Sequence, residues 1–343
     1  MIGLGIVGCG WAAGEIVRAS SGLDGLEIVS VADTDRPRAE ALATKAGATV
    51  ADDVDAMLQD PKITAIYAGL PHALLPQVVR RALEAGRHVL SEKPLALTPK
   101  EATQLGALAE ARHRKLAVFF ELRRAGTVQM ARRLVQEGRI GEVRFVHFRT
   151  IIDKRRDYWG PPGHLNWRAS KAMAGGGVVM MNSIHQLDTV RYVTGLDYAS
   201  VSGSIATFAA PAGVEVEDAA SATITLSNGG MASLVASAHA PGAQRAETIE
   251  IDGTLGRLDL PDPFGDEPLR LYADGRWTEI PVERPDSHRL MLAAFVDAIV
   301  KDGPVPASAA DAAAALFVVD GLYRSAATGR VVQSGTSAAK VSR

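Results

Sequence analysis

Two residues of opposite charge, Glu92 and Lys93, stand at the end of a short apolar run and directly before a proline. Val89 and Leu90 have the character of a buried strand, and parallel sheets bind ligands beyond the carboxyl ends of their strands. Pro94 disfavours helical dihedral angles at the preceding residue, so the Lys93 ammonium should project in a fixed direction. We therefore expect this pair at a ligand-binding edge of a sheet; an ion pair on a surface loop is the alternative.

A glycine-rich turn begins at Gly8 and follows the pattern G-x-G-x-x-A. It lies between an apolar strand, residues 2–7, and a helical pattern. Gly8 allows the tight turn, and Gly10 lets backbone amides approach a pyrophosphate at the N-terminus of the helix. Trp11 and Ala12, which come next, are expected to contact the same ligand. The pattern predicts a dinucleotide-binding turn.

An acidic residue, Asp33, follows the second apolar strand and lies 23 positions after Gly10. A carboxylate at about this separation bonds the 2′-hydroxyl of a dinucleotide ribose and repels a 2′-phosphate, which favours NAD over NADP. Arg36 and Arg38 follow closely and keep NADP as the alternative. A helix N-cap without a ligand role is the structural alternative for such an aspartate, and it fits Asp35 better than Asp33.

One histidine, His185, is a candidate for proton transfer because histidine titrates near neutral pH. It lies on a helical pattern that three glycines, residues 175–177, precede. Asp188 stands at i+3, where it can reach either the imidazole or Arg191, and we expect its role to be mainly structural. A packed histidine on an amphipathic helix is the alternative for His185.

An irregular, charged and aromatic stretch, residues 153–171, is long for a structureless connection, and such loops are usually functional. Arginine donors suit hydroxyl groups or a carboxylate, and aromatic rings suit the C–H faces of a polyol. For the arginines of this stretch a solvated loop is the alternative. The expected substrate contacts are Arg123, Arg124, Arg155, Arg156, Tyr158, His164, Trp167 and Arg168.

Two domains are predicted from the pattern of elements. Strands and helices alternate over residues 1–121, which predicts an α/β domain with a doubly wound parallel sheet. Residues 122–343 are expected to form an α+β domain, because tight-turn signals such as Asn228-Gly229 join its strands into an antiparallel sheet. Two alanine-rich helices, roughly 287–301 and 308–328, close the chain.

The composition excludes several classes of protein. The formal net charge is −2, so no basic field favours nucleic acid or anionic lipid. The single cysteine, Cys9, excludes an internal disulfide, and no Cys/His cluster has the spacing of a zinc site. No apolar run is long enough to cross a bilayer, and no signal peptide is recognisable. We expect a cytoplasmic protein without a metal ion, a membrane partner or a nucleic-acid partner.

In this order and with these separations, the motifs resemble those of the glucose–fructose oxidoreductase / inositol dehydrogenase / rhizopine-catabolism (Gfo/Idh/MocA) family. The similarity extends over essentially the whole length. It implies an N-terminal Rossmann domain, a C-terminal domain with an open, mainly antiparallel sheet, and hydride transfer between NAD(P) and a sugar or cyclitol hydroxyl carbon. The residues that carry it are Gly8-Cys9-Gly10, Asp33, Glu92-Lys93-Pro94, Gly175-Gly176-Gly177 and Ile184-His185-Gln186-Leu187-Asp188.

By this resemblance, Lys93 binds the substrate and His185 handles the hydroxyl proton. The chemistry agrees, since oxidising an alcohol requires a base for the proton and a cation for the developing alkoxide. Desolvation and a neighbouring positive charge could instead lower the pKa of Lys93 enough to make it the base, and both assignments stay open. The resemblance also assigns cofactor contacts to Pro71, His72, Glu92 and Arg168.

The sequence departs from the family pattern four positions before the histidine, where an acidic or amide residue is usual and Met181 stands here. Asn182 follows it and could replace it if the backbone shifts locally. Both are expected to contact substrate, although an amide is no base at neutral pH. Alternative functions are a carbonyl or imine reductase, an NAD-assisted glycosidase, and a non-catalytic dinucleotide sensor. The exposed face of the antiparallel sheet suggests a homodimer or homotetramer.

Overall fold

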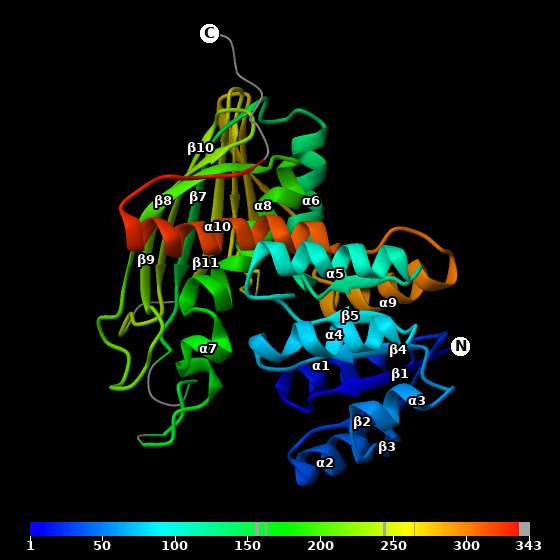
Figure 1. The fold of residues 1–343 in the computed structure, drawn as a ribbon. Helices are drawn as coiled ribbons and strands as arrows, with labels where there is room; N and C mark the ends of the chain where they lie inside the picture. Colours follow the sequence, from blue (N-terminus) through cyan, green and yellow to red (C-terminus); the bar gives the residue numbers. More distant parts are fainter. Residues whose placement is uncertain (155–157, 162, 243–244, 264, 336–343) are drawn as a thin grey trace. The chain divides into compact units, whose positions relative to one another are not determined.

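The computed structural model describes residues 1–154, 158–161, 163–242, 245–263 and 265–335 (Figure 1). The chain divides into two compact units. The first contains residues 1–121 and 286–313, and the second contains residues 122–285 and the remainder from 314 onward. The first division falls after Glu121, and a domain boundary at this position remains a proposal. Residues 286–313, however, group with the first unit, whereas we expected them in the C-terminal domain.

The reason for this difference is the packing of helix α9 (Ser287–Val300) against helix α1 (Trp11–Ser20). The carboxylate of Asp286 caps α9 by accepting a hydrogen bond from the Arg289 backbone N–H, and it also pairs with Arg18 of α1 at 2.5 Å. The Arg289 guanidinium donates to three main-chain carbonyls at the end of α1, those of Ala19, Ser21 and Gly22. These contacts attach α9 to the first unit.

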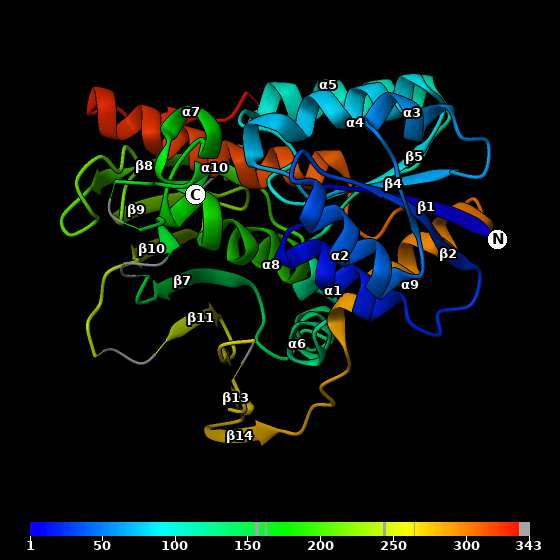
Figure 2. The same cartoon turned by 90° about the horizontal axis from the view of Figure 1, so that it is seen from below.

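The first unit is built on six parallel strands in the order β3-β2-β1-β4-β5-β6. Its helices cover both faces of the sheet, with α4 and α5 on one face and α1 and α9 on the other (Figure 2). The doubly wound α/β architecture is therefore confirmed. The strands are β1 (Ile2–Val7), β2 (Leu26–Ala32), β3 (Thr49–Val50), β4 (Ala65–Ala68), β5 (His88–Ser91) and β6 (Leu116–Val118). The connecting helices are α2 (Arg36–Ala46), α3 (Val54–Gln59), α4 (Leu75–Glu84) and α5 (Pro99–Ala111).

The helices of this unit begin where local sequence rules place them. Asp35 is the N-cap of α2, and its side chain accepts a hydrogen bond from the Arg38 backbone N–H. Thr98 caps α5 in the same way, with Pro99 at the first helical position. Because Asp35 is the N-cap of α2, the carboxylate of Asp33, directly after β2, is not needed to cap this helix.

The second unit contains a nine-stranded sheet in the order β14-β13-β12-β11-β7-β10-β9-β8-β15. All neighbouring strands are antiparallel except β7 and β10, which run parallel. The mainly antiparallel sheet is thus confirmed. The strands are β7 (Val143–Ile151), β8 (Tyr198–Ala206), β9 (Ala219–Leu226), β10 (Met231–Ser237), β11 (Ala246–Gly253), β12 (Arg257–Leu260), β13 (Leu269–Ala273), β14 (Arg276–Ile280) and β15 (Val332–Gln333).

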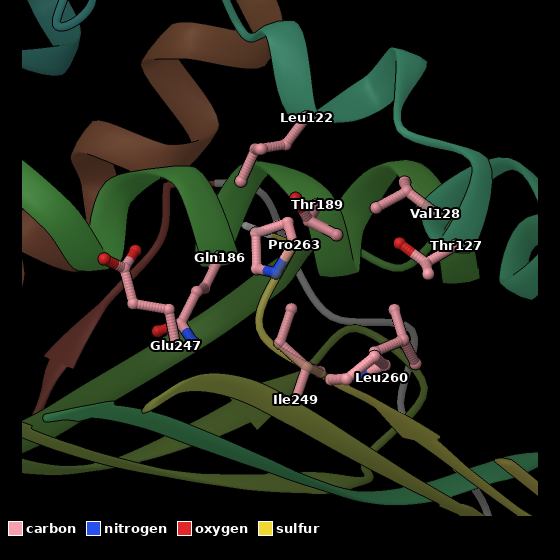
Figure 3. A pocket seen from close by; sticks show the side chains of 10 residues that line it. Leu122, Thr127, Val128, Gln186, Thr189, Glu247, Ile249, Leu260 and Pro263 are labelled. Carbon is pink, nitrogen blue, oxygen red and sulfur yellow. The ribbon is translucent and has the colours of Figure 1, made fainter. Parts of the chain in front are cut away.

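One face of this sheet is covered by helices. Helix α6 (Gly126–Gln136) and helix α8 (Ile184–Thr194) pack against each other and against β12 and β11 (Figure 3). The strands alternate buried and exposed residues, so the opposite face is open; Met231 and Val235 of β10 are 46% and 48% exposed there. The two other helices are α7 (Lys171–Ala174), in the second unit, and α10 (Ala309–Thr328). The division between the two units falls within α10, after Ala313.

Candidate active site

The glycine turn lies at the carboxyl end of β1, next to β4, where the strand order of the first sheet reverses. Gly8 has a φ of 89°, and a Cβ atom there would lie 2.2 Å from the Gly69 carbonyl oxygen, so only glycine fits. Gly10 is the N-cap of α1, and a Cβ atom at Gly10 would meet nothing within 4 Å. The first turn of α1 has no acidic residue, so its backbone N–H groups can donate hydrogen bonds to a pyrophosphate.

The Asp33 carboxylate lies beside this turn. It accepts hydrogen bonds from the Cys9 backbone N–H at 2.7 Å and from the Asp35 backbone N–H at 2.9 Å. Each oxygen retains a lone pair, and the side chain is partly exposed, so the group can still bond a ribose hydroxyl. Arg38 pairs with Asp35 at 3.3 Å, and Arg36 pairs with Glu40 at 3.1 Å. The residues present therefore fit NAD.

The other expected cofactor contacts of the first unit differ in exposure. Trp11 is 77% exposed at the start of α1, and Ala12 and Pro71 are partly exposed. The His72 side chain is buried, at 5% exposure, and His72 begins the short 3-10 turn His72–Leu74 that precedes α4.

Glu92 and Lys93 follow β5 at the same edge of the sheet. The Tyr67 hydroxyl, from β4, donates a 2.7 Å hydrogen bond to Glu92 Oε1. Burial raises the pKa of the Glu92 carboxyl, while the hydrogen bond from Tyr67 and the charge of Lys93 act in the opposite direction. Glu92 is therefore anchored to the neighbouring strand, and both Glu92 and Lys93 are partly exposed. The Lys93–Pro94 peptide bond is cis.

In the second unit, residues 178–190 form one almost completely buried helical segment. Every residue in this range is described, and only Asn182 and His185 are partly exposed. They stand at i and i+3, so they share one face of the segment. Met181 is 5% exposed. The segment begins with a π-helix, Val179–Ser183, and such turns often mark functional sites. Met181 and Asn182 both lie within this π-helix.

A buried carboxylate holds the start of this segment. Glu217 accepts hydrogen bonds from the backbone N–H groups of Gly177, at 2.7 Å, and Val179, at 3.1 Å, and from the Tyr323 hydroxyl, at 3.0 Å. Burial raises the pKa of the Glu217 carboxyl, and these hydrogen bonds oppose that shift. A Cβ atom at Gly176 would lie 1.9 Å from the Tyr323 hydroxyl oxygen, which explains a glycine there.

The residues before α7 approach the same segment. The Lys154 ammonium donates a hydrogen bond to Asn182 Oδ1 and lies 4.0 Å from the centroid of the Tyr158 ring. The Tyr158 hydroxyl donates to Met181 Sδ. The Arg168 guanidinium lies 5.3 Å from the Tyr158 ring centroid and stacks on the neighbouring Trp167 ring, at 4.7 Å. Of the expected aromatic contacts, the structure thus places Tyr158 against Met181 and against the lysine that binds Asn182.

The Tyr158 phenol stays protonated at neutral pH. Burial raises its pKa to about 12, although the charge and hydrogen bond of Arg168 act to lower it. The stretch that contains it also has a small core of its own, formed by Trp159, Ala169 and Val216. Tyr158 is packed against this core.

Arg123 has a different environment from the one expected of a substrate contact. It is 5% exposed, and its guanidinium forms two hydrogen bonds, at 2.7 and 2.6 Å, with the buried carboxylate of Asp188. Arg191 pairs with Asp197 at 2.5 Å. We therefore assign Arg123 a structural role in place of substrate binding. Asp188 has the structural role that the sequence suggested, with a partner that it did not.

The remaining expected contacts are dispersed. Arg124 is partly exposed, and within the described residues its buried Nε makes no hydrogen bond. His164 is exposed in a turn in which its backbone N–H donates to the Pro161 carbonyl. Arg155 and Arg156 lie outside the described residues.

Lys93 belongs to the first unit and His185 to the second. That they meet over one substrate remains a prediction.

Sequence reasoning missed Lys154. The signal that could have found it is its place directly beyond β7, where its backbone N–H donates to the Ala238 carbonyl.

A pocket with about 320 Å³ of empty space, including its opening, lies on the sheet side of α8 (Figure 3). Asn182 and His185 do not line it. The lining residues are Leu122, Thr127, Val128, Gln186, Thr189, Glu247, Ile249, Leu260, Pro261 and Pro263.

Among the described residues, no group of three or more His, Cys, Asp and Glu side chains is placed to hold a metal ion. No helix in the described part of the chain has the length and apolar character needed to cross a membrane.

The chain matches two family models. Residues 2–120 match the model described as oxidoreductase family, NAD-binding Rossmann fold. Residues 128–259 match the model described as GFO/IDH/MocA C-terminal domain. The two matches fall on the parallel sheet and on most of the mixed sheet.

Two named oxidoreductases are similar to this chain over almost their whole length. A 1,5-anhydro-D-fructose reductase of Ensifer adhaerens is 30% identical, over 98% of this chain and 98% of its own. Inositol 2-dehydrogenase 1 of Saccharopolyspora erythraea is 28% identical, over 96% of this chain and 95% of its own.

Solved structures share the fold. An oxidoreductase domain protein from Kribbella flavida superimposes with a TM-score of 0.88 at 26% identity, over 97% of this chain and 98% of its own. Levoglucosan dehydrogenase in complex with NADH gives a TM-score of 0.87 at 23% identity, over 97% of this chain and 98% of its own. With its NAD-binding Rossmann domain followed by the characteristic C-terminal domain, the chain belongs to the Gfo/Idh/MocA oxidoreductase family.

Proposed function

We propose that the protein is an NAD-dependent dehydrogenase that oxidises a secondary hydroxyl of a sugar, sugar derivative or cyclitol. The observation that carries this proposal is that Asn182 and His185 are the two partly exposed residues of the otherwise buried helical segment 178–190. The His185 imidazole is therefore partly accessible, although its Nδ1 atom is buried. The similarity to a 1,5-anhydro-D-fructose reductase and an inositol 2-dehydrogenase supports a polyhydroxylated substrate.

The cofactor site is proposed at the carboxyl edge of the first sheet. When bound there, NAD supplies the hydride acceptor. The backbone at Gly8, Gly10, Trp11 and Ala12 would hold the pyrophosphate, and Asp33 would bond the ribose. The Asp33 carboxylate would repel a 2′-phosphate, and Arg36 and Arg38 are engaged by acidic side chains, which supports NAD over NADP. The other proposed contacts are Pro71, His72, Glu92, Lys93 and Arg168.

Proton transfer is assigned to Lys93 and His185. The His185 imidazole takes the hydroxyl proton, while the Lys93 ammonium stabilises the negative charge that develops on the substrate oxygen. In the alternative assignment Lys93 is the base and His185 orients the hydroxyl. Neither Met181 nor Asn182 can accept a proton at neutral pH, so no third base is proposed. The proposed substrate contacts are Arg124, Arg155, Tyr158, His164, Trp167, Met181 and Asn182.

A carbonyl reductase is the second candidate, because the relative that is 30% identical is named as a reductase. The same residues would act in reverse, with His185 or Lys93 giving its proton to the carbonyl oxygen. A cytoplasmic location remains a prediction.

The proposed function is tested by incubating the protein with NAD+ or NADP+ and a panel of aldoses, anhydro-sugars and inositols, and following absorbance of the reduced cofactor. We expect turnover with NAD+ and at least one polyol. Lys93→Ala should lower turnover by about 10²–10⁴-fold, the contribution of a general acid–base group. Tight dinucleotide binding without turnover in either direction would instead indicate a sensor. If Lys93→Ala lowers turnover by less than about threefold, Lys93 has no part in the mechanism.

A further inference from the structure

Lys154 stands out because of what its ammonium contacts. It donates a hydrogen bond to Asn182 Oδ1 and lies over the Tyr158 ring. Its position along the chain is fixed as well, since its backbone N–H donates to the Ala238 carbonyl at 2.8 Å. The side chain therefore meets Asn182 from a defined direction.

This contact determines which end of the Asn182 amide faces outward. An ammonium carries three hydrogen-bond donors and no acceptor, so only the amide oxygen can face it. The two orientations of an asparagine amide are otherwise chosen by the surrounding hydrogen bonds. With its oxygen turned to Lys154, the planar amide directs its NH2 group away from Lys154. Asn182 thus offers two donors on its open side.

The neighbouring Met181 adds no acceptor. Its side chain is buried, and its sulfur accepts the Tyr158 hydroxyl. On this part of the segment, the polar atoms presented next to His185 are therefore the N–H donors of Asn182. Donors of this kind bind a lone pair of oxygen, and in a water-poor site they favour a partially negative oxygen.

We propose that Lys154 is a positioning residue that turns the Asn182 NH2 group toward the substrate. The amide then binds a hydrogen-bond-accepting oxygen of the sugar, either a hydroxyl lone pair or the oxygen of a carbonyl or carboxylate group. This inference rests on the proposed function, in which Asn182 lines the substrate site. Lys154 acts through Asn182 and takes no part in the transfer of the hydroxyl proton.

A double-mutant cycle tests this arrangement. Lys154→Met removes the donors at similar length, and Asn182→Ala removes the amide. Each should lower kcat/KM by about tenfold, in the range expected for a lost hydrogen bond to a polar or charged group. The double variant should be no worse than the poorer single variant. Lys154→Arg, another donor-only cation, should recover most of the loss, and Lys171→Met, on an exposed lysine, should have no effect.

Two kinetic results would overturn the inference. A Lys154→Met enzyme within twofold of the wild type would show that the ammonium has no role. Losses that multiply in the double variant would show that Lys154 acts independently of Asn182.

A measurement without turnover separates this inference from the proposed function. In ¹⁵N spectra, the side-chain NH2 signals of Asn182 are identified by their loss in Asn182→Ala. They should shift in Lys154→Met and return toward their original position in Lys154→Arg. Unchanged signals would refute the contact, whatever the enzyme does. A shift together with a wild type that oxidises no sugar would contradict the proposed function and leave the amide orientation supported.

Discussion

Asp33 is oriented by the main chain before any ligand arrives. Both of its oxygens accept backbone N–H groups, one from the glycine turn and one from the start of α2. A carboxylate fixed in this way loses little entropy when it binds a ribose, and it keeps its negative charge in one place. Cofactor preference should therefore depend on this single side chain.

Asp33→Ala should reduce the preference for NAD over NADP by roughly tenfold or more, since a hydrogen bond to a charged group is lost and the repulsion of a 2′-phosphate disappears. The measurement is kcat/KM with each cofactor. Thr98→Ala is the matched control, because it removes the N-cap of α5, at a cost of about 1 kcal/mol in stability, and should leave the preference unchanged. An unaltered preference in Asp33→Ala would remove this residue from the cofactor site.

Single residues were predictable from sequence where the governing rule is local. Asp35 and Asp33 were distinguished by the position of a helix start, and the structure agrees about Asp35. The environment of Arg123 was not predictable, because its partner Asp188 lies 65 positions further along the chain. Lys154 was missed for the same reason, since Asn182 lies 28 positions away. A single sequence does not record which distant side chains meet.

At the scale of elements, the helical segment that carries Asn182 and His185 depends on an acid from another part of the chain. Glu217 takes two backbone N–H groups at the start of the segment, where the unsatisfied donors of a helix end favour a negative group. Tyr323 of α10 holds the same carboxyl from the other side. The buried Glu217 carboxylate therefore fixes the start of the segment that carries Asn182 and His185, although Glu217 is not one of the proposed ligand contacts.

This arrangement predicts how stability responds to pH. Because burial raises the pKa of Glu217 above its ordinary 4.5, the native state holds the proton more tightly than the unfolded chain. Its stabilising contribution is complete below about pH 4.5 and declines as the pH rises through the raised pKa. The destabilisation caused by Glu217→Gln should thus be largest at low pH and shrink toward neutral pH, as measured by urea unfolding.

The control for this prediction is Glu215→Gln. Glu215 is exposed and accepts a hydrogen bond from the Lys171 backbone N–H. The substitution therefore removes a glutamate two positions from Glu217 without changing the buried site. If Glu217→Gln lowers the free energy of unfolding by the same amount at every pH, the prediction is contradicted.

Elements joined by short turns were predictable, and long-range pairings were not. The hairpin of β9 and β10 formed at Asn228-Gly229 because that dipeptide favours the turn that such strands need. The parallel pairing of β7 with β10 joins strands more than eighty residues apart, and no local signal marks it. The π-helix was also hidden, because a short apolar run fits a strand or a buried helix equally well.

At the scale of the molecule, the open face of the nine-stranded sheet is the feature that remains to be explained. On this face, Val235 of β10 pairs with Ser221 of the neighbouring strand β9 on one side and with Arg149 of β7 on the other. We propose this face as the contact with a second copy of the chain, because a flat sheet surface with exposed apolar residues suits a symmetric interface.

Val235→Arg should weaken self-association by on the order of tenfold or more, because it places an unpaired charge in the middle of the proposed interface. Sedimentation or light scattering over a range of concentrations measures this effect. Val300→Arg is the matched control, since Val300 is 66% exposed at the end of α9 and belongs to the first unit. A monomeric wild type at high concentration would contradict the proposed interface.

The return of residues 286–313 to the first unit has a consequence for any attempt to exchange the two halves. The polypeptide passes from one unit to the other after Glu121, after Pro285 and after Ala313. A fragment that stops at residue 121 would lack α9 and leave the packed side of α1 bare to solvent. Grafting a new cofactor half onto this protein would therefore require transplanting two separate stretches of gene together.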